Sequence, residues 1–375
     1  MESERKMKDC IGIINLDENE KGMGELVKKR VLGSVPIGGK YRIIDFVLSN
    51  MTNSGIECIG IFTKNKSRSL MDHLTNGRPW DLHRKKDGLK VFNFGDNEPY
   101  YEDVHNFLDN IAFVKYSRKE YVLLAPSYMI CNIDYSEIIY NHRKSDNDIT
   151  VIYKEVNNAD KSFIDCDVLN IDEKNRVISV GENLGEKKHA NISMEMYLMK
   201  TEIFIDIVYD SIRSGEYRKV KQFIHSKLKS LKVYAHKFEG YVSCINTLEE
   251  YYKTNMDFLD EDISQEIFCN KDLIYTKSKD CAPTQYTEDS VVKNSIIANG
   301  SYIEGEVEDC IIGRSVHVAK GVKLRGCILM QNAVIKVNSE INNMIIEKGM
   351  EIGENEKYIG TKNFPMVIYP RNFKY

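Results

Sequence analysis

Aliphatic residues occupy every sixth position over long stretches of the last quarter of this 375-residue chain. They stand at Val291, Ile297, Ile303, Ile312, Val318, Leu324, Leu329, Ile335, Ile341, Ile346 and Ile352. Neither an α-helix nor an alternating strand has a six-residue period, whereas each coil of a parallel β-helix contains about three such units. The spacing from Ile312 to Leu329, repeated from Leu329 to Ile346, is 17 residues, close to three hexads. The period predicts a β-helix, and the alternative is a β-sandwich in which the spacing arose by chance.

Residues 8 to about 258 follow a different pattern, in which short apolar runs alternate with longer mixed stretches. The runs have the length of buried strands and are Cys10–Leu16, Cys58–Thr63, Tyr121–Ala125, Ile149–Tyr153 and Met194–Met199. Ile44–Met51 and Val104–Lys115 have the spacing of helices. Strands that alternate with helices predict a mostly parallel sheet covered on both faces.

The two patterns divide the chain into an α/β domain over residues 1–258 and a β-helix over residues 286–375. The segment between them, residues 259–285, is acidic and then rich in lysine, and we expect it to be a linker. A length of 375 residues is in the range of two domains.

Composition excludes several classes of function. The net charge of −4 gives no reason to expect a nucleic acid or a membrane surface as partner. The nine cysteines form no Cys-x-x-Cys pair, and the histidines do not cluster at the spacing of metal ligands. The polar N-terminus lacks the apolar segment of a signal peptide, and no apolar run would span a bilayer. We expect a cytoplasmic protein with reduced thiols.

Several segments, in a fixed order, carry a resemblance to a known family. They are Gly38–Phe46, Leu48–Asn50, Asn53–Ile56, Asn76–Leu82, Ile133–Tyr135, Ser193–Met194 with Tyr197, Glu239–Tyr241 and Asn255–Asp257. In this order they resemble the glucose-1-phosphate adenylyltransferases (ADP-glucose pyrophosphorylases), and most of all the GlgD-type regulatory branch of glycogen biosynthesis. The resemblance implies a Rossmann-like (GT-A-like) nucleotidyltransferase domain followed by a left-handed parallel β-helix of hexapeptide repeats.

The family transfers an adenylyl group from ATP to glucose 1-phosphate, which requires cations around the phosphates and carboxylates that hold Mg²⁺. Carried over position by position, the resemblance places other residues where the catalytic groups belong. The Gly-rich loop falls on the acidic stretch Asp17–Gly22, and three carboxylates there would repel a triphosphate. The five degenerate catalytic positions are Gly22 (Arg in the family), Leu32 (Lys), Tyr128 (a metal-holding Asp), Asn183 (Lys) and Cys244 (an acid).

Two alternatives keep catalysis. Lys21 would act as a substitute cation, or the alignment slips and Asp17, Asp134, Lys187 or Lys188 supplies a missing group. An alignment error at one position is reasonable, but independent errors at all five positions are not. The resemblance therefore predicts a non-catalytic, allosteric subunit (a pseudoenzyme) that is inactive alone and binds no cofactor itself. Its partner would be a catalytic homologue that uses Mg²⁺, in a mixed tetramer.

A group of cations remains beside the altered loop. They are Lys28, Lys29, Arg30, Lys40 and Arg42. In the catalytic relatives a Lys matching Lys29 lies where sugar-phosphate activators bind. We interpret the group as an effector or interface patch, and the alternative is a solvated helix face.

Three other functions remain open. The first is an active nucleotidyltransferase with rearranged catalytic residues. The second is an acyltransferase, because β-helices of this kind often use a coil histidine, and His317 is the candidate. The third is a sugar-nucleotide binding module that has no partner enzyme.

Overall fold

The structure is a computed structural model of the chain, and it describes residues 7–63, 66–93, 102–269 and 272–369. Two compact units account for these residues. Unit 1 comprises the described residues of 1–18, 44–244 and 271–275, and unit 2 those of 19–43, 245–270 and 276–375. The chain therefore crosses between the units several times. The predicted succession of domain, linker and domain does not describe these units.

A nine-stranded sheet forms the centre of unit 1, in the order β10-β9-β11-β6-β1-β4-β5, with β8 paired to β11 and β12. Its strands are β1 (Cys10–Asn15), β4 (Cys58–Thr63), β5 (Gly88–Asn93), β6 (Tyr121–Ala125), β8 (Ile149–Val156), β9 (Asp167–Ile171), β10 (Val177–Glu182), β11 (Ala190–Lys200) and β12 (Val233–Lys237). All five predicted strands are present. The sheet is mixed rather than mostly parallel, because β11 runs antiparallel to β6, β8 and β9.

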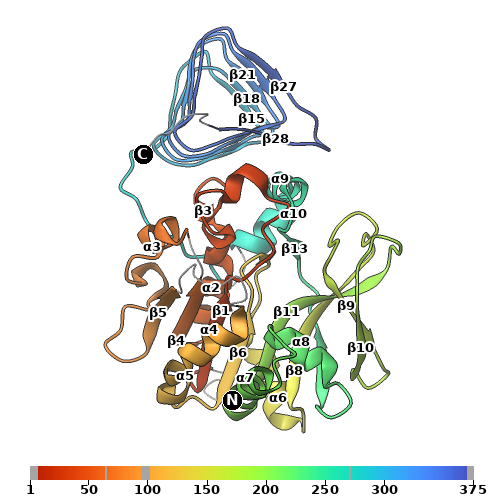
Figure 1. Ribbon diagram of the computed structural model, residues 1–375. Coiled ribbons are helices and arrows are strands. Elements are labelled where there is room, and N and C mark those ends of the chain that lie inside the picture. Colours follow the sequence, from red (N-terminus) through yellow and green to blue (C-terminus); the bar gives the residue numbers. More distant parts are fainter. Residues whose placement is uncertain (1–6, 64–65, 94–101, 270–271, 370–375) are drawn as a thin grey trace. The chain divides into compact units, whose positions relative to one another are not determined.

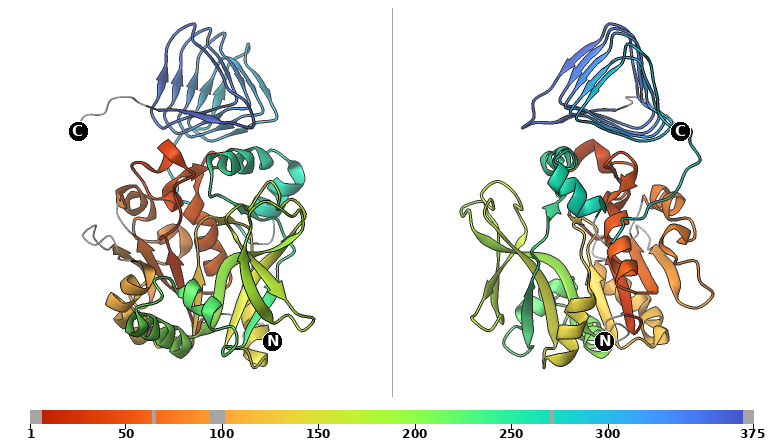
Figure 2. Two further views of the ribbon diagram at one scale, coloured as in Figure 1. Left: turned by 45° about the vertical axis from the view of Figure 1, so that its right-hand side comes forward. Right: turned by 180° about the vertical axis from the view of Figure 1, so that it is seen from behind.

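Helices cover both faces of this sheet (Figures 1 and 2). They are α2 (Ile43–Asn53), α3 (Arg68–Leu74), α4 (Asp103–Asp109), α5 (Ile111–Ser117), α6 (Ser136–Lys144), α7 (Thr201–Ser214) and α8 (Val220–Ser226), with a short 3₁₀ turn at Arg78–Trp80. The helix predicted over Val104–Lys115 is two helices. Asn110 separates them, and its side-chain amide donates to the carbonyl of Asn106, a local bond that competes with regular helix.

Apolar side chains from the strands and helices form the core of unit 1. Ile11 and Ile13 of β1, Val122 of β6 and Phe204 of α7 are all fully buried in it. A small antiparallel pair, β7 (Met129–Ile130) with β13 (Ser243–Cys244), lies beyond the end of β6. The parallel strands β1 and β6 thus end next to the loops that hold the predicted catalytic positions of unit 1.

Unit 2 contains a parallel β-helix of three five-stranded sheets with a triangular cross-section (Figure 1). The first sheet consists of β14 (Gln285–Tyr286), β17 (Tyr302–Ile303), β20 (His317–Val318), β23 (Val334–Ile335) and β26 (Glu351–Ile352). The second consists of β15 (Val291–Lys293), β18 (Glu306–Glu308), β21 (Lys323–Arg325), β24 (Glu340–Asn342) and β27 (Lys357–Ile359). The third consists of β16 (Ile296–Ile297), β19 (Ile311–Ile312), β22 (Ile328–Leu329), β25 (Met344–Ile346) and β28 (Met366–Ile368). Ile312 pairs with Leu329, which pairs with Ile346, so the 17-residue repeat is confirmed as one coil.

The hexad residues from Ile303 to Ile352 are buried inside the coils. Earlier in the chain, Ile297 is half-buried, and Val291 is exposed because β15 belongs to the first coil and is exposed along its whole length. Asparagines turn several corners of the coils in the left-handed conformation, as at Asn332 and Asn338. Asparagine adopts this conformation at lower cost than other non-glycine residues.

A glycine-rich hairpin of unit 2 packs on helix α9 (Leu248–Asp257) and on the coils. Its strands are β2 (Pro36–Ile37) and β3 (Tyr41–Arg42). Gly39 has φ +77°, and a Cβ atom there would lie 3.0 Å from the carbonyl oxygen of Ile312. The amide of Gly38 donates to the side chain of Asn255 (3.0 Å), and the Tyr252 hydroxyl donates to the carbonyl of Gly326 (2.6 Å). These contacts join residues 19–43 and α9 to the β-helix in one unit.

The segment predicted to be a linker contains regular structure at its start. It forms α10 (Glu261–Ser264) and a π-helical turn (Gln265–Cys269), preceded by the buried ring of Phe258. The ring of Phe268 packs edge-on against Phe258 and stacks on Tyr41 of the hairpin, with both centroid distances 5.0 Å. Short 3₁₀ turns at Gly24–Val27 and Leu32–Ser34 complete unit 2. Among the described residues, none of the helices is long and apolar enough to span a bilayer.

Candidate functional site

The predicted site begins with the acidic stretch after β1, and its carboxylates bind the protein's own donors. Glu18 accepts hydrogen bonds from the backbone amide and the hydroxyl of Ser127, which follows β6. Glu20, in unit 2, accepts from the amide of Leu32 (2.7 Å). Backbone amides and hydroxyls are the groups that would otherwise bind phosphate oxygens. Intramolecular carboxylates therefore take the place of a bound anion at these donors.

Gly22, where the resemblance predicts a catalytic arginine in the family, leaves no room for a side chain. A Cβ atom there would lie 2.5 Å from the carbonyl oxygen of Asn246 and 3.1 Å from the Cα atom of Thr247. Gly22 itself accepts a hydrogen bond from the amide of Leu248 (3.0 Å). Lys21, the alternative cation, is exposed, and its backbone amide bonds to Asn19. Leu32, where the resemblance predicts a second cation in the family, is buried.

Tyr128 follows Ser127 in the loop after β6 and bonds to an acid that is not among the predicted site residues. Its hydroxyl donates to the carboxylate of Glu195. Burial raises the pKa of Tyr128 well above its ordinary value, and the nearby Glu195 raises it further. A neutral phenol at this position is a poor ligand for Mg²⁺.

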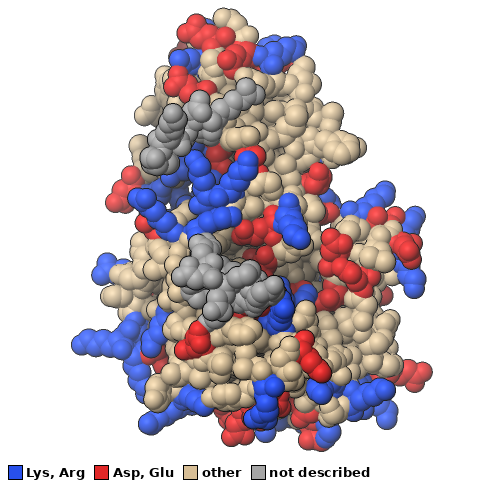
Figure 3. All heavy atoms as spheres, in the orientation of Figure 1, with Lys and Arg blue, Asp and Glu red and all other residues tan. Residues whose placement is uncertain are grey.

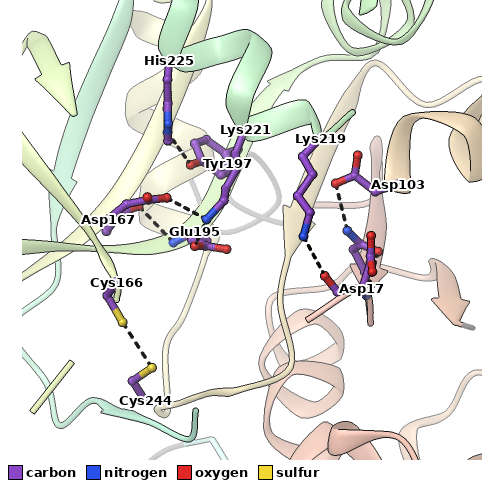
Figure 4. A network of polar contacts seen from close by, with 12 residues as sticks. Asp17, Asp103, Cys166, Asp167, Glu195, Tyr197, Lys219, Lys221, His225 and Cys244 are labelled. Carbon is purple, nitrogen blue, oxygen red and sulfur yellow. Dashed lines mark hydrogen bonds and ion pairs between the residues drawn. The ribbon is translucent and has the colours of Figure 1, made fainter. Parts of the chain in front are cut away.

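Cys244 and Asn183 are buried and are occupied by local contacts. The Sγ atom of Cys244 lies 3.3 Å from that of Cys166, as a hydrogen-bond contact between two free thiols (Figure 4). The side-chain amide of Asn183 donates to three backbone carbonyls, of Ala159, Ser162 and Phe163, and its oxygen accepts from the amide of Gly185. Each side chain therefore holds neighbouring loops together.

The centre of the site is an ionic cluster formed by Lys221 of α8 with Asp167 of β9 and Glu195 of β11 (Figure 4). The Nζ atom of Lys221 lies 3.0 Å from Asp167 and 2.6 Å from Glu195. Burial alone would lower the pKa of Lys221, but the two carboxylates raise it above its usual value. Beside the cluster, the Tyr197 hydroxyl contacts His225, whose pKa is lowered by burial.

Glu195 also has an unusual backbone. Its φ is +54°, at an irregularity in the pairing of β11 with β8 between Ser193 and Met196. A non-glycine residue in this conformation costs about 1–2 kcal/mol and persists only where surrounding contacts compensate. Burial raises the pKa of Glu195, and Lys221 opposes that rise. The matching segment Ser193–Met194 with Tyr197 flanks this residue, and it is the one sequence signal that could have directed attention to it.

A second acid, Asp103 at the start of α4, lies near the end of β1. Its carboxylate accepts from the side chain of Asn15 (3.2 Å) and from the amide of Val220 (3.1 Å). Burial raises its pKa to about 7, against a lowering effect of Lys219. Lys219 also donates to the carbonyl of Asp17 (3.4 Å; Figure 4). Neither Asp103 nor Lys219 is among the five catalytic positions predicted from the resemblance.

The remaining candidates for a rescued catalytic group do not join the cluster. Asp134 is exposed and caps the first turn of α6 through the amide of Ser136 (2.8 Å). Lys187 and Lys188 are exposed. Asp17 does lie beside the site, near Asp103 and Lys219.

The arrangement does not fit the magnesium ions that the family uses. In the described part of the chain, His, Cys, Asp and Glu side chains form no group of three that could hold a metal ion. The two carboxylates nearest to Tyr128, Glu18 and Glu195, already accept hydrogen bonds from protein groups, and Lys221 neutralises Glu195 and Asp167. A buried acid neutralised by a lysine is a weak cation ligand, so we derive no metal-dependent step from this site.

The predicted effector cations have different surroundings within unit 2. Lys28 forms an ion pair with Glu25, and Arg30 forms one with Glu347. Lys29 and Lys40 are exposed. Arg42 lies in a group of positive charges that the sequence analysis did not assemble: Arg42, Lys277, Lys279, Arg314 and Lys348. Partial burial and these like charges lower the pKa of Lys279.

Comparison with known proteins agrees with this architecture. Residues 26–261 match the nucleotidyl transferase family, and residues 281–363 match the GlmU-like C-terminal hexapeptide family. The chain is 32% identical to the glycogen biosynthesis protein GlgD of Bacillus subtilis over 361 residues, which is 96% of this chain and 95% of that protein. It is 33% identical to the protein of the same name from Geobacillus stearothermophilus over 315 residues, 83% of this chain and 81% of that protein.

A third relative is the glucose-1-phosphate adenylyltransferase of Fervidobacterium nodosum, which is 30% identical over 355 residues, 93% of this chain and 84% of that enzyme. The chain belongs to the glucose-1-phosphate adenylyltransferase family of nucleotidyl transferases, and its predicted resemblance to the GlgD-type members is confirmed.

Proposed function

We propose that the chain is a regulatory subunit of ADP-glucose pyrophosphorylase in glycogen biosynthesis, which performs no adenylyl transfer itself and acts on a catalytic homologue. The names of the relatives support the pathway, since two are glycogen biosynthesis proteins and others are glucose-1-phosphate adenylyltransferases. The proposal concerns the role of this chain within that reaction.

The observation that carries the proposal is the set of contacts at the positions of lost catalytic groups. A side chain at Gly22 would collide with the backbone of Asn246. Tyr128 bonds to Glu195, and the side chain of Asn183 is committed to four backbone groups. A slipped alignment would leave such positions open to a substrate, whereas these residues are integrated into the packing. The family match also begins at residue 26, after the acidic stretch.

A regulatory subunit needs a ligand or a partner contact that changes its partner's state, because coupling arises only from unequal binding to two states. The cations around Lys279, namely Arg42, Lys277, Arg314 and Lys348, are our candidate for an anionic effector such as a sugar phosphate. Such coupling amounts to about 1–3 kcal/mol in typical cases. In this proposal Mg²⁺ belongs to the catalytic partner, and the two chains form a mixed tetramer.

The test is pyrophosphate release from ATP and glucose 1-phosphate by this chain, by its catalytic homologue and by the mixture. We expect no turnover by this chain alone and a higher rate, or a lower substrate requirement, in the mixture. The variant Arg42→Ala/Lys279→Ala should assemble normally and lose the response to a sugar phosphate. Lys28→Ala, which removes a cation outside the group, is the matched control.

A second experiment tests the loss of chemistry. Gly22→Arg combined with Tyr128→Asp reinstates two of the family's residues, and we expect no turnover because the backbone around Gly22 excludes the side chain. Turnover by the unmodified chain alone would contradict the proposal and favour an active nucleotidyltransferase with rearranged residues. Size-exclusion chromatography that detects no complex with the homologue would favour a free binding module.

A further inference from the structure

An open pocket of about 1040 Å³ lies at the amino edge of the sheet in unit 1. Asp9 precedes β1, Cys58 opens β4, Asp87 precedes β5 and Lys119 precedes β6, and all four residues line the pocket. The candidate functional site lies beyond the opposite ends of the same strands, after Asn15 and Ala125. The two sites are therefore on opposite edges of the sheet, and the family's reaction does not account for this pocket.

Positive charge dominates the lining. Six cations and two acids line the pocket. The cations are Lys8, Lys85, Lys86, Lys90, Arg118 and Lys119, and the acids are Asp9 and Asp87. Asp87 is neutralised by Lys119 (3.1 Å), and Asp9 by Arg143. Glu57, which lies next to the pocket, pairs with Arg84 (3.1 Å) and Lys8 (3.9 Å).

Four of the cations have no described acid within ion-pair distance: Lys85, Lys86, Lys90 and Arg118. All four are exposed at the mouth of the pocket. At the lower left of the molecule in Figure 3, basic side chains lie over the stretch that leads into β5, which is labelled in Figure 1. Like charges held around one concavity repel each other, and a bound anion with several charges would remove that repulsion.

Aromatic rings form the second part of the pocket. Phe92 and Phe113 pack together with centroids 4.9 Å apart, and the ammonium group of Lys90 lies over the ring of Phe113 (5.4 Å). Tyr116 is 84% exposed, more than the other large apolar or aromatic side chains described. Arg118, which ends α5, has φ +54°, so its backbone is held in a costly conformation beside the pocket.

We propose that this pocket binds a nucleoside phosphate. The phosphates would bind Lys85, Lys86 and Arg118, whose guanidinium suits bidentate contact with phosphate oxygens. The base would stack on the exposed ring of Tyr116, a contact that every base can make. A volume of about 1040 Å³ is at the upper end of small-molecule pockets and accommodates a nucleoside diphosphate. The proposal is independent of the proposed function, since it uses no residue of the candidate site.

The test is calorimetric titration of the full chain with ADP and, separately, with inorganic pyrophosphate. Lys85→Ala/Lys86→Ala/Arg118→Ala should raise the dissociation constant of both ligands about tenfold or more, because three charge-assisted contacts are lost. Tyr116→Ala should weaken ADP about tenfold and leave pyrophosphate unchanged. Hydrogen exchange should slow at residues 85–92 and 113–120 when ADP is bound.

Two control variants separate this pocket from other sites. Lys187→Ala/Lys188→Ala/Arg213→Ala removes three exposed cations elsewhere in unit 1 and should leave binding unchanged. Arg42→Ala/Lys279→Ala removes two cations of the group in unit 2 and should also leave ADP binding unchanged. The proposal is overturned if ADP does not bind, if the pocket triple binds ADP like the unmodified chain, or if the unit 2 variant abolishes binding. Equal affinity for pyrophosphate and ADP would contradict the nucleoside assignment.

Discussion

The ionic cluster of unit 1 and the glycine-rich hairpin of unit 2 both lie within residues 26–261, which match one family, yet different interactions hold them in place. In the cluster, Asp167, Glu195 and Lys221 bind one another through charge. In the hairpin, Gly38 and Gly39 provide a backbone path that packs on neutral groups. The comparison teaches that the hairpin depends on backbone packing, whereas the cluster depends on the charges of its side chains. Backbone geometry depends on glycine and packing, while catalysis depends on a few side chains that other residues can replace.

The largest effect should come from removing the cation of the cluster. Lys221→Met leaves Asp167 and Glu195 facing each other without a cation, and removing one partner of such a pair typically costs about 3–5 kcal/mol. We expect this drop in the free energy of unfolding, measured by urea denaturation. Lys221→Met/Glu195→Gln/Asp167→Asn removes the charges together and should recover most of the loss. If the single and triple variants are equally destabilised, packing rather than charge holds the cluster.

Asp103 should make the stability of unit 1 depend on pH. Its pKa is about 7 in the folded protein and near 3.8 in the unfolded chain, so the folded state binds more protons between these values. Stability should therefore fall as the pH rises from about 4 to about 7 and change little above that range. The fall is at most about 4 kcal/mol, since one pKa unit corresponds to about 1.4 kcal/mol.

The control for that prediction is Asp103→Asn, which cannot ionise. Urea denaturation at pH 4.5 and pH 8 should show a smaller difference for this variant than for the unmodified chain. An identical difference in both proteins would assign the pH dependence to other groups. Burial lowers the pKa of His142 from 6.5 to about 4, so this residue raises stability as the pH rises from about 4 to 6.5, opposite to Asp103 and equally in both proteins.

The hairpin should respond to added volume rather than to charge. Gly39→Ala places a Cβ atom 3.0 Å from the carbonyl oxygen of Ile312 at φ +77°, so it combines backbone strain with a close contact. We expect a loss of about 1–3 kcal/mol. Gly24→Ala is the matched control, because Gly24 has φ +52° and no atom within 4 Å of the added Cβ. Equal losses in the two variants would show that the contact with the coils contributes nothing.

The sequence predicted the parts of the fold that have a period, and it missed the parts that depend on contacts between distant segments. The 17-residue coil follows from side chains that must all point inward, so the repeat was visible without a structure. The strand direction of β11 was not, because an antiparallel strand buried on both faces has the same apolar pattern as a parallel one. The contacts of Phe268 were not predicted, because its ring packs against Phe258 and Tyr41 from a segment of polar composition.

The residues of the candidate site also divide into those that the sequence could predict and those that depend on contacts between distant segments. Resemblance located Tyr128 and Cys244, because each is a substitution at one matched position. Lys221, Glu195 and Asp167 lie on three different elements, and none of them stands in a pattern that marks it as charged and buried. Arg42 was identified, but the four lysine and arginine residues that surround it come from more than 230 positions away in the chain. Proximity of this kind is a property of the folded chain alone.

The smallest predicted effect concerns a single neutral hydrogen bond beside the hairpin. Tyr252→Phe removes the bond from the hydroxyl to the carbonyl of Gly326, with little change in volume. A buried hydrogen bond of this kind contributes about 0.5–1.5 kcal/mol, and the loss should be in that range. Tyr302→Phe, at a partly exposed ring of the β-helix, should change the free energy of unfolding by less. If Tyr252→Phe lowered the free energy of unfolding as much as Lys221→Met, the contrast between the two units would not hold. Unit 2 would then depend on one polar contact as strongly as unit 1 depends on its charges.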